Sequence, residues 1–447
     1  MTHKIISLTL SAILCSAFSG LRAADSIKHV KTGLTFGALP AIAFDSDIGF
    51  KYGLLTNFYW FGDGSTYPKY LHSFYFEFNR TTKGSGLLQF VYDSEYLIPK
   101  IRITAEASYF TEQALDFYGF NGYKAWYNHD FEDSDNTGDG YISRMFYRHD
   151  RKVLRLRSDF QGSIIGKKFR WMAGFEYNGF RVGTVNIDKL NKGKKKDKLP
   201  EDTPLLYDKF VEWGVIKDDE KDGGNHAMFK FGLVYDTRDN EPNPMSGVWS
   251  DIILLTAPSF MGNKSAGYTK LAITHRQYFT LVDEILSLAV RLSYQPKIGG
   301  TIPFYALPYA YNTSTNIVRD GLGGAKTMRG ILRNRVVGDD MFYGNVELRW
   351  KFFRKVLQKR QDHVYLALQT FSDFGQVTRA YKFSYDDSIE EARNWFAEGG
   401  SEKLHISYGA GISGALNYNF VAHVNYGRAV DKRDGKSGLY IGLNYLF

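Results

Sequence analysis

The stretch MFYGNVELRWKF, residues 341–352, alternates between apolar and polar side chains. One set of alternate positions is apolar: Phe342, Val346, Leu348, Trp350 and Phe352. The other set is mostly polar: Tyr343, Asn345, Glu347, Arg349 and Lys351. A period of two is typical of a β-strand with one apolar and one polar face. About ten residues is also the length that a tilted strand needs to cross a bilayer.

The same alternation recurs along the chain. In GLYIGLNYLF, residues 438–447, the side chains of Leu439, Ile441, Leu443, Tyr445 and Phe447 are predicted to share one face. We count about sixteen candidate strands, near residues 32–43, 48–60, 70–81, 86–97, 101–111, 142–164, 168–183, 227–236, 247–256, 268–279, 284–294, 341–354, 362–374, 404–416, 418–429 and 438–447. Strands of this length with aromatic ends favour a membrane barrel over a soluble sandwich.

The spacers between these strands support an even strand number. The longest ones, near residues 112–141, 184–226, 295–340 and 375–403, all follow odd-numbered strands. Bacterial outer-membrane barrels have short periplasmic turns and long outer loops. The sequence therefore predicts an all-β, sixteen-stranded antiparallel transmembrane β-barrel in the bacterial outer membrane. Both termini would be periplasmic and the long loops extracellular.

Composition and targeting signals agree with this class. Aromatic residues make up 16% of the chain, and proline is scarce. Residues 1–24 have the pattern of a secretory signal peptide, with the only cysteine, Cys15, inside it. Residues 25–447 would then form the barrel, with no periplasmic domain. The net charge is +8, but the lysine-rich run at 191–198 has no accompanying nucleic-acid motif, so we interpret it as a solvated loop.

The segment GLGGAKTMRG, residues 321–330, allows two interpretations. A phosphate-binding loop needs glycine before its lysine and a helix after it. Here Ala325 precedes Lys326, and no helical pattern follows. We therefore expect no nucleotide, and the second half of the segment becomes the informative part.

Several motifs resemble those of the BamA/TamA family of outer-membrane assembly proteins. They are YDTRDNEPNPMSG (235–247), TMRGI (327–331), YGNVELRW (343–350), FSDFG (371–375) and the closing NYLF. Met328 and Ile331 stand where the family prefers a β-branched residue and an aromatic one. The resemblance implies sixteen strands and an inward-folded loop between strands eleven and twelve. It also implies insertion or translocation of outer-membrane proteins, or of lipid, through a lateral seam, with outer-membrane lipid, client proteins and accessory subunits as partners. Family members usually carry periplasmic POTRA domains, which we do not expect here.

Arg329 is the candidate residue that fixes this loop. A guanidinium inside a barrel needs partners, and Glu347 and Asp373 are predicted on lumen-facing positions of neighbouring strands. A tight backbone would be permitted by four glycines: Gly321, Gly323, Gly324 and Gly330. The alternative is an ordinary solvated arginine. If Arg329 locks the loop, Arg329→Ala should raise protease sensitivity of the loop or pore conductance.

A weak seam is predicted where the first strand meets the last. Gly33, Gly37 and Pro40 weaken strand one, because glycine lacks a side chain to pack and proline lacks a ladder donor. Gly442 and Phe447 would lie on the facing strand. The seam could open sideways and present an edge to an incoming strand, or it could be permanently closed.

Other functions receive less support. The acidic runs at 131–141 and 235–247 lack the spacing of a calcium loop, so we expect no metal. No catalytic motif appears, and we expect neither an enzyme nor a cofactor. The alternative function is a passive pore or a surface-exposed binding protein. Five cations predicted in the lumen would bias such a pore toward anions: Lys270, Arg276, Arg291, Arg349 and Lys351.

Overall fold

The computed structural model describes residues 30–67, 69–135, 140–196, 198–262, 267–314, 318–357, 362–416 and 420–447. The predicted signal peptide, with Cys15, lies outside these ranges. No helix within them is both long and apolar enough to cross a membrane.

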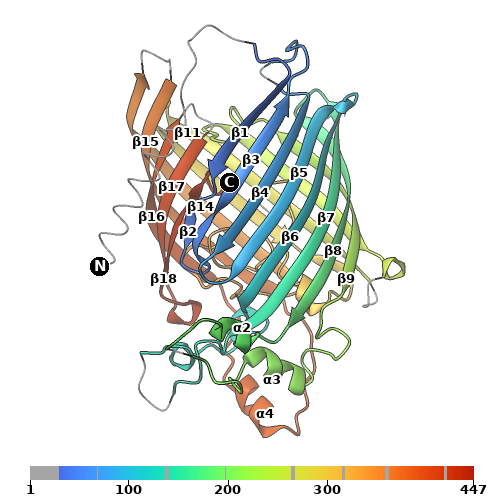
Figure 1. Cartoon of the computed structure of the whole chain (residues 1–447), viewed down its shortest axis with the longest axis vertical. Coiled ribbons are helices and arrows are strands. Elements are labelled where there is room, and N and C mark those ends of the chain that lie inside the picture. Colours follow the sequence, from blue (N-terminus) through green and yellow to red (C-terminus); the bar gives the residue numbers. More distant parts are fainter. Residues whose placement is uncertain are drawn as a thin grey trace.

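Sixteen antiparallel strands close into one barrel, as predicted (Figure 1). The first strand consists of two labelled segments, β1 and β2, and the eleventh of β12 and β13. The strands are β1 (Leu34–Pro40), β2 (Ala43–Asp45), β3 (Gly49–Trp60), β4 (His72–Thr81), β5 (Ser85–Ile98), β6 (Ile101–Asp116), β7 (Arg148–Ile165), β8 (Phe169–Gly183), β9 (Asn225–Asp236), β10 (Gly247–Ala257), β11 (Tyr268–Val282), β12 (Leu286–Gln295), β13 (Lys297–Gly300), β14 (Asp340–Leu357), β15 (Asp362–Arg379), β16 (His405–Leu416), β17 (Phe420–Ala429) and β18 (Ser437–Leu443). The α-helices are α2 (Ile187–Asn191), α3 (Leu206–Glu212) and α4 (Glu390–Ala397), and the 3-10 helices are η1 (Gly122–Lys124), η2 (His129–Phe131), η3 (Ser259–Met261), η4 (Phe304–Ala306) and η5 (Lys432–Asp434).

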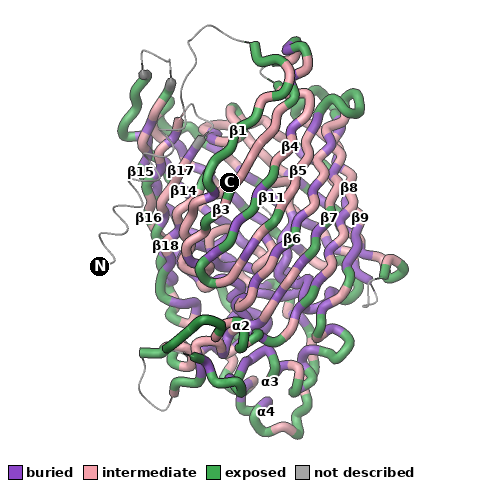
Figure 2. The backbone as a smooth tube through the Cα atoms, viewed as in Figure 1, coloured by how far each residue is buried: buried purple, intermediate pink, exposed green. Residues whose placement is uncertain are grey.

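Burial alternates from residue to residue along most of the strands (Figure 2). On β14, Glu347 and Arg349 are buried in the lumen, whereas Leu348 and Trp350 are 39% and 49% exposed on the outside. A polar interior inside an apolar wall is the inverse of a soluble protein, and it suits a barrel whose outside faces lipid.

The predicted strand ends were wrong in four places. The first strand is interrupted after Pro40 and continues to Asp45. Residues 142–147 belong to a loop, and β7 begins only at Arg148. The eleventh strand is broken at Pro296, which lacks an N–H donor, and resumes as β13. The last strand ends at Leu443 because Asn444 adopts a left-handed backbone with φ of 64°.

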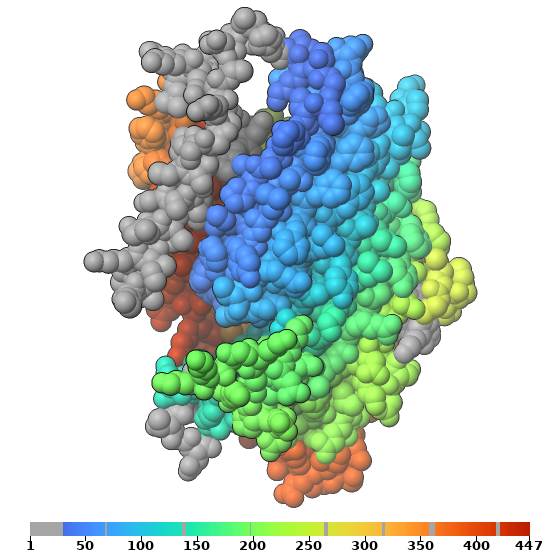
Figure 3. All heavy atoms as spheres, in the orientation of Figure 1, coloured from blue at the N-terminus to red at the C-terminus, as the bar shows by residue number. Residues whose placement is uncertain are grey.

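The long loops gather at one end of the barrel (Figures 1 and 3). We call their described residues within 117–147, 184–224 and 380–404 the cap. Buried aromatic rings hold these loops together, with Trp395 packing 4.7 Å from Trp126, 5.7 Å from Phe146 and 6.0 Å from Trp213 between ring centroids. Burial and a hydrogen bond to Asp434 raise the pKa of the Tyr123 phenol above its usual range. The buried rings of the cap belong to an apolar core that continues into the adjoining part of the barrel.

The described residues of the loop that joins β13 to β14, 301–314 and 318–339, fold into the lumen, and we call them the plug loop. Its Arg333 forms an ion pair with Glu112 on β6. Its Asn334 side chain donates to the Asp116 carbonyl at 2.7 Å, and its Leu332 N–H donates to the Asp434 carbonyl at 2.9 Å. The plug loop therefore contacts β6 on one side and the connection between β17 and β18 on the other.

Candidate functional site

The tip of the plug loop is a tight hairpin that only glycine permits. Leu322 and Val336 exchange backbone hydrogen bonds of 2.9 and 3.1 Å. Gly321, Gly323 and Gly324 have φ values of 60°, 120° and 76°, which disfavour other residues. These glycines turn the chain so that the segment Thr327–Gly330 points at β14 and β15.

Arg329 joins the two predicted carboxylates. Its Nε and Nη2 donate to the Asp373 carboxylate at 2.8 Å each, and its backbone N–H donates to the same group at 2.9 Å. Its Nη1 lies 2.7 Å from Glu347 Oε1. The guanidinium also stacks on Phe371, with 3.5 Å between its carbon and the ring centroid. The side chain is 2% exposed, so these contacts replace nearly all of its hydration.

Further contacts on the wall support Glu347 and the neighbouring plug loop. Glu347 Oε2 accepts hydrogen bonds from Arg349 at 2.7 and 2.9 Å. Asn345 donates to the Thr327 carbonyl of the plug loop at 2.6 Å. Because every group in this cluster is buried, removing one charge leaves its partners unpaired in a medium of low polarity, which is costly. The arrangement can therefore hold one loop position against the wall with high specificity.

Gly330 connects the ion-pair cluster of Arg329, Glu347 and Asp373, which we call the lock, to the last strands. Its N–H donates to the Tyr440 hydroxyl on β18 at 2.9 Å. Its φ is 92°, and a Cβ placed there would lie 2.5 Å from the Arg428 nitrogen on β17. Gly427 is equally crowded, because its Cβ would lie 2.6 Å from the Arg329 carbonyl oxygen. The plug loop thus passes over β17 at backbone contact distance, which requires glycine on both sides.

The junction between the first and last strands is the weakest in the wall. Only two residue pairs join β18 to β2, Tyr440 with Asp45 and Ile441 with Phe44. Ser46 adds a reciprocal contact with Leu439, since the Ser46 N–H donates to the Leu439 carbonyl at 3.1 Å and the Leu439 N–H donates to the Ser46 hydroxyl at 2.7 Å. In contrast, β17 and β18 share seven pairs. We call the β2–β18 junction the seam.

The predicted seam residues lie near this junction, with one exception. Gly37 and Pro40 belong to β1, and Gly33 precedes it. β1 pairs with β3 through seven residues, and no pairing of β1 with β18 occurs among the described residues. Gly442 lies on β18 just beyond the two seam pairs. Among the described residues, one edge of β1 therefore has no strand paired with it.

Phe447 was wrongly predicted to lie on the seam. After the turn at Asn444 the chain leaves the wall, and the Tyr445 hydroxyl lies 3.2 Å from that of Tyr365. The Phe447 ring packs under Arg291 at 4.9 Å and Arg349 at 5.4 Å. The alternation that continues through Tyr445 and Phe447 gave no sign of this, because a left-handed residue changes direction without breaking the pattern.

The five cations predicted in the lumen are all buried there. Arg276 Nη1 lies 2.8 Å from Asp251, and Arg349 pairs with Glu347. Arg291 donates to the Asn345 side chain at 2.8 Å and to the Lys326 carbonyl at 3.1 Å. The remaining two are Lys270 and Lys351. These arginines therefore contact the wall and the plug loop through buried hydrogen bonds and ion pairs.

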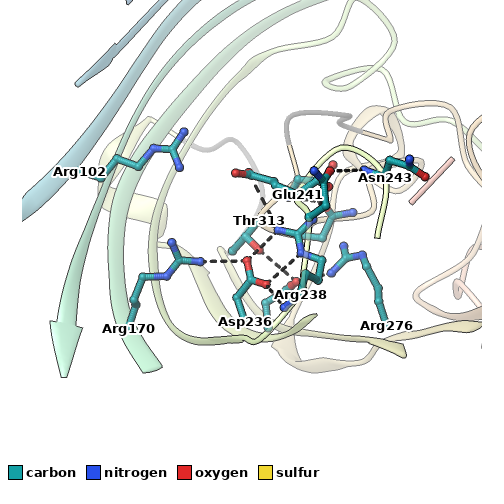
Figure 4. A network of polar contacts seen from close by, with 12 residues as sticks. Arg102, Arg170, Asp236, Arg238, Glu241, Asn243, Arg276 and Thr313 are labelled. Carbon is teal, nitrogen blue, oxygen red and sulfur yellow. Dashed lines mark hydrogen bonds and ion pairs between the residues drawn. The ribbon is translucent and has the colours of Figure 1, made fainter. Parts of the chain in front are cut away.

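The segment 235–247 forms an inward-facing polar cluster at the opposite end from the cap (Figure 4). Arg238 pairs with Asp236 at 2.7 Å, and Arg170 lies 3.4 Å from the same carboxylate. Arg238 and Arg276 stack on Trp249 at 3.9 and 3.8 Å. This motif is thus a structured turn between β9 and β10.

Sequence reasoning missed a second ionic cluster between the plug loop and the wall. Arg151 on β7 lies 2.6 Å from Glu112 and 2.5 Å from Asp320 of the plug loop, and Arg333 pairs with both carboxylates. Glu112 was placed in a spacer because β6 was predicted to end at residue 111. The alternation of Glu106, Ser108, Phe110 and Glu112 was the available signal.

Comparisons with known proteins agree with this architecture. A family model described as the Omp85 superfamily domain matches residues 84–447. The fold is similar to that of BamA from Haemophilus ducreyi lacking POTRA domains 1–3, with a TM-score of 0.53 and 14% identity over 93% of this chain and 71% of that chain. CdiB from Escherichia coli is similar with a TM-score of 0.53 and 10% identity, over 92% of this chain and 63% of that chain. No curated protein sequence matches the chain.

Proposed function

The chain belongs to the Omp85 superfamily, an assignment that implies the outer membrane, and we propose that its barrel inserts or translocates outer-membrane proteins at the seam. The free edge of β1 would pair with an incoming strand while the plug loop stays locked in the lumen. In this proposal the termini are periplasmic and the cap is extracellular.

The two-pair seam is the observation that carries the proposal. A strand edge with unpaired N–H and C=O groups can accept another strand by main-chain hydrogen bonding. β1 offers seven residues with such an edge, and its side chains are mostly exposed. Pro40 closes this edge at one end because it has no N–H to donate. The client chain would therefore engage Leu34 to Leu39, before the point where β2 meets β18.

The lumen itself is a less suitable route. Arg329 and Arg333 tie the plug loop to opposite walls through buried ion pairs. Moving the loop aside would separate several buried charges, each at a cost of about 3–5 kcal/mol. Separating the seam would break only two residue pairs and the Ser46 contacts. This difference favours lateral action over passive conduction through the barrel.

A reversible staple across the seam tests the proposal. In a Cys15→Ser background, Phe44→Cys with Ile441→Cys places two cysteines on directly paired residues. The matched control, Ile412→Cys with Val424→Cys, staples the paired strands β16 and β17. Each protein is reconstituted in liposomes, a denatured outer-membrane barrel client is added, and client folding is followed by gel mobility with and without reductant.

We expect wild type and the control to accelerate client folding. The oxidised seam staple should abolish this acceleration, and reductant should restore it. Acceleration that persists in the fully oxidised seam variant would contradict the lateral mechanism alone. An absence of acceleration by the wild-type protein would contradict the assembly function itself.

A further inference from the structure

Three basic residues form a continuous row on the outer face of β4 to β8. Arg80 is paired with Gly86, Gly86 with Thr111, Thr111 with Lys152, and Lys152 with Arg181. These positions therefore follow one line across five neighbouring strands. We call Arg80, Lys152 and Arg181 the basic row.

The basic row points away from the lumen. The residues next to it along the strands are buried inside: Asn79, Phe110, Val153, Phe180 and Val182. Arg80 and Arg181 are exposed, and the Lys152 side chain is 41% exposed. The basic row is therefore exposed on the outer surface of the barrel.

The next line of outward positions, two residues farther from the cap, is apolar. Leu54 is paired with Phe78, Phe78 with Leu88, Leu88 with Tyr109, and Tyr109 with Leu154. All five side chains are between 42% and 59% exposed. A charged line directly above an exposed apolar line marks the boundary between acyl chains and headgroups.

The cations of the row are close together and poorly neutralised. Lys152 and Arg181 are directly opposite, an arrangement in which like charges destabilise a sheet. Lys152 has one partner, Asp150 at 3.1 Å. Within the described ranges, neither Arg80 nor Arg181 forms an ion pair with a carboxylate. An anion beside the row would relieve this repulsion.

Gly86 shapes the row by leaving room for Arg80. The Arg80 guanidinium lies across Gly86 and donates to the Thr111 hydroxyl at 3.1 Å. A Cβ at Gly86 would lie 2.6 Å from Arg80 Nη1. The three positive groups are thus brought over β5 to β8, a width of roughly 14 Å at about 4.8 Å per strand.

The chain continues from this row into an exposed lysine segment. β8 ends two residues after Arg181, and α2 is followed by Lys192, Lys194, Lys195 and Lys196, all exposed. Two hydrogen bonds between Asn191 and Leu199, of 2.7 and 2.8 Å, close the base of this segment. In Figure 1, α2 lies at the cap-side end of the wall. The positive surface therefore extends from the row toward the cap.

We propose that the basic row is a binding site for the phosphorylated headgroup of a membrane lipid. Arg80, Lys152 and Arg181 contact phosphate oxygens, Thr111 orients Arg80, and the acyl chains lie on the apolar line below. The lipid source is favoured over a free phosphate because the site adjoins the acyl-facing wall.

Lipid binding is tested on the folded full-length barrel in a neutral detergent. Diphosphoryl lipid A is titrated, and bound lipid is counted by native mass spectrometry. The test variant carries Arg80→Gln, Lys152→Gln and Arg181→Gln. The control carries Lys167→Gln, Lys168→Gln and Lys355→Gln, three exposed lysines at the opposite end of the wall. Heat-dependent gel mobility verifies that each barrel is folded.

We expect the row variant to bind lipid A at least about tenfold more weakly and the control to bind as wild type. Gly86→Ala, which displaces Arg80 while keeping every charge, should weaken binding to a smaller extent. Equal affinity in wild type and the row variant would overturn the site. So would an equal loss in the control, or full displacement of the lipid by an equal concentration of inorganic phosphate.

Discussion

The β14–β15 junction and the seam are opposite extremes of the same wall. β14 and β15 share sixteen residue pairs and present Glu347 and Asp373 to Arg329. The seam has two pairs, and its first strand is interrupted after Pro40. Both junctions are antiparallel and face the same lipid. Their difference in strength therefore comes from pairing length and from the buried charges that only the first junction carries.

This contrast shows how one barrel can be both rigid and open to change. The plug loop is tied to the strongest junction of the wall through Arg329. Its direct link to β18 is the hydrogen bond from Gly330 to Tyr440. We therefore expect a change at the seam to strain this hydrogen bond first and to leave the ion pairs of Arg329 intact.

Among the substitutions near the β14–β15 junction, Arg329→Ala is expected to lower the free energy of unfolding most. It leaves Glu347 and Asp373 buried with too few partners, at a cost of about 3–5 kcal/mol in the free energy of unfolding. Urea unfolding followed by gel mobility measures this loss, and limited proteolysis measures release of the plug loop. The control is Arg354→Ala, which removes an exposed ion pair with Glu284 and should cost less than about 1 kcal/mol. Similar losses in both variants would contradict the lock.

Gly330→Ala tests the close passage of the plug loop over β17. The new Cβ would lie 2.5 Å from the Arg428 nitrogen in a left-handed backbone, so we expect a loss of about 1–3 kcal/mol. Gly214→Ala is the matched control, because Gly214 has a φ of 74° with nothing within 4 Å of an added Cβ. If the two variants unfold at the same urea concentration, backbone strain alone explains the effect and the contact does not matter.

Periodicity predicted the wall well because a strand in a membrane must alternate at every position. The interior and exterior sides of β14 follow the predicted faces. Arg329, Glu347 and Asp373 were predicted to lie within reach of one another, since strand order places lumen-facing positions of β14 and β15 side by side.

Chain direction at single residues could not be predicted in the same way. The turn at Asn444 and the break at Pro296 depend on local backbone geometry, which leaves the alternation unchanged. The Arg151 and Arg333 cluster depends on where the plug loop meets β6 and β7. The contacts between Arg151 and Asp320 and between Arg333 and Glu112 join residues 169 and 221 positions apart, so a single sequence gives no direct sign that they meet.

Tyr440→Phe is expected to have the smallest effect and gives the sharpest comparison between the two regions. It removes the hydroxyl that accepts from the Gly330 N–H, and a single hydrogen bond contributes about 1 kcal/mol. Hydrogen exchange should become faster at the Gly330 amide and stay unchanged at the Arg329 amide, which donates to Asp373. Tyr445→Phe, which removes a hydroxyl near Tyr365 and Ser413, is the control and should change neither amide. Tyr440 also belongs to one of the two residue pairs of the seam. Faster exchange at both amides would therefore mean that the position of the plug loop depends on the seam. Faster exchange at the Gly330 amide alone would support a barrel in which the seam moves independently of the β14–β15 junction.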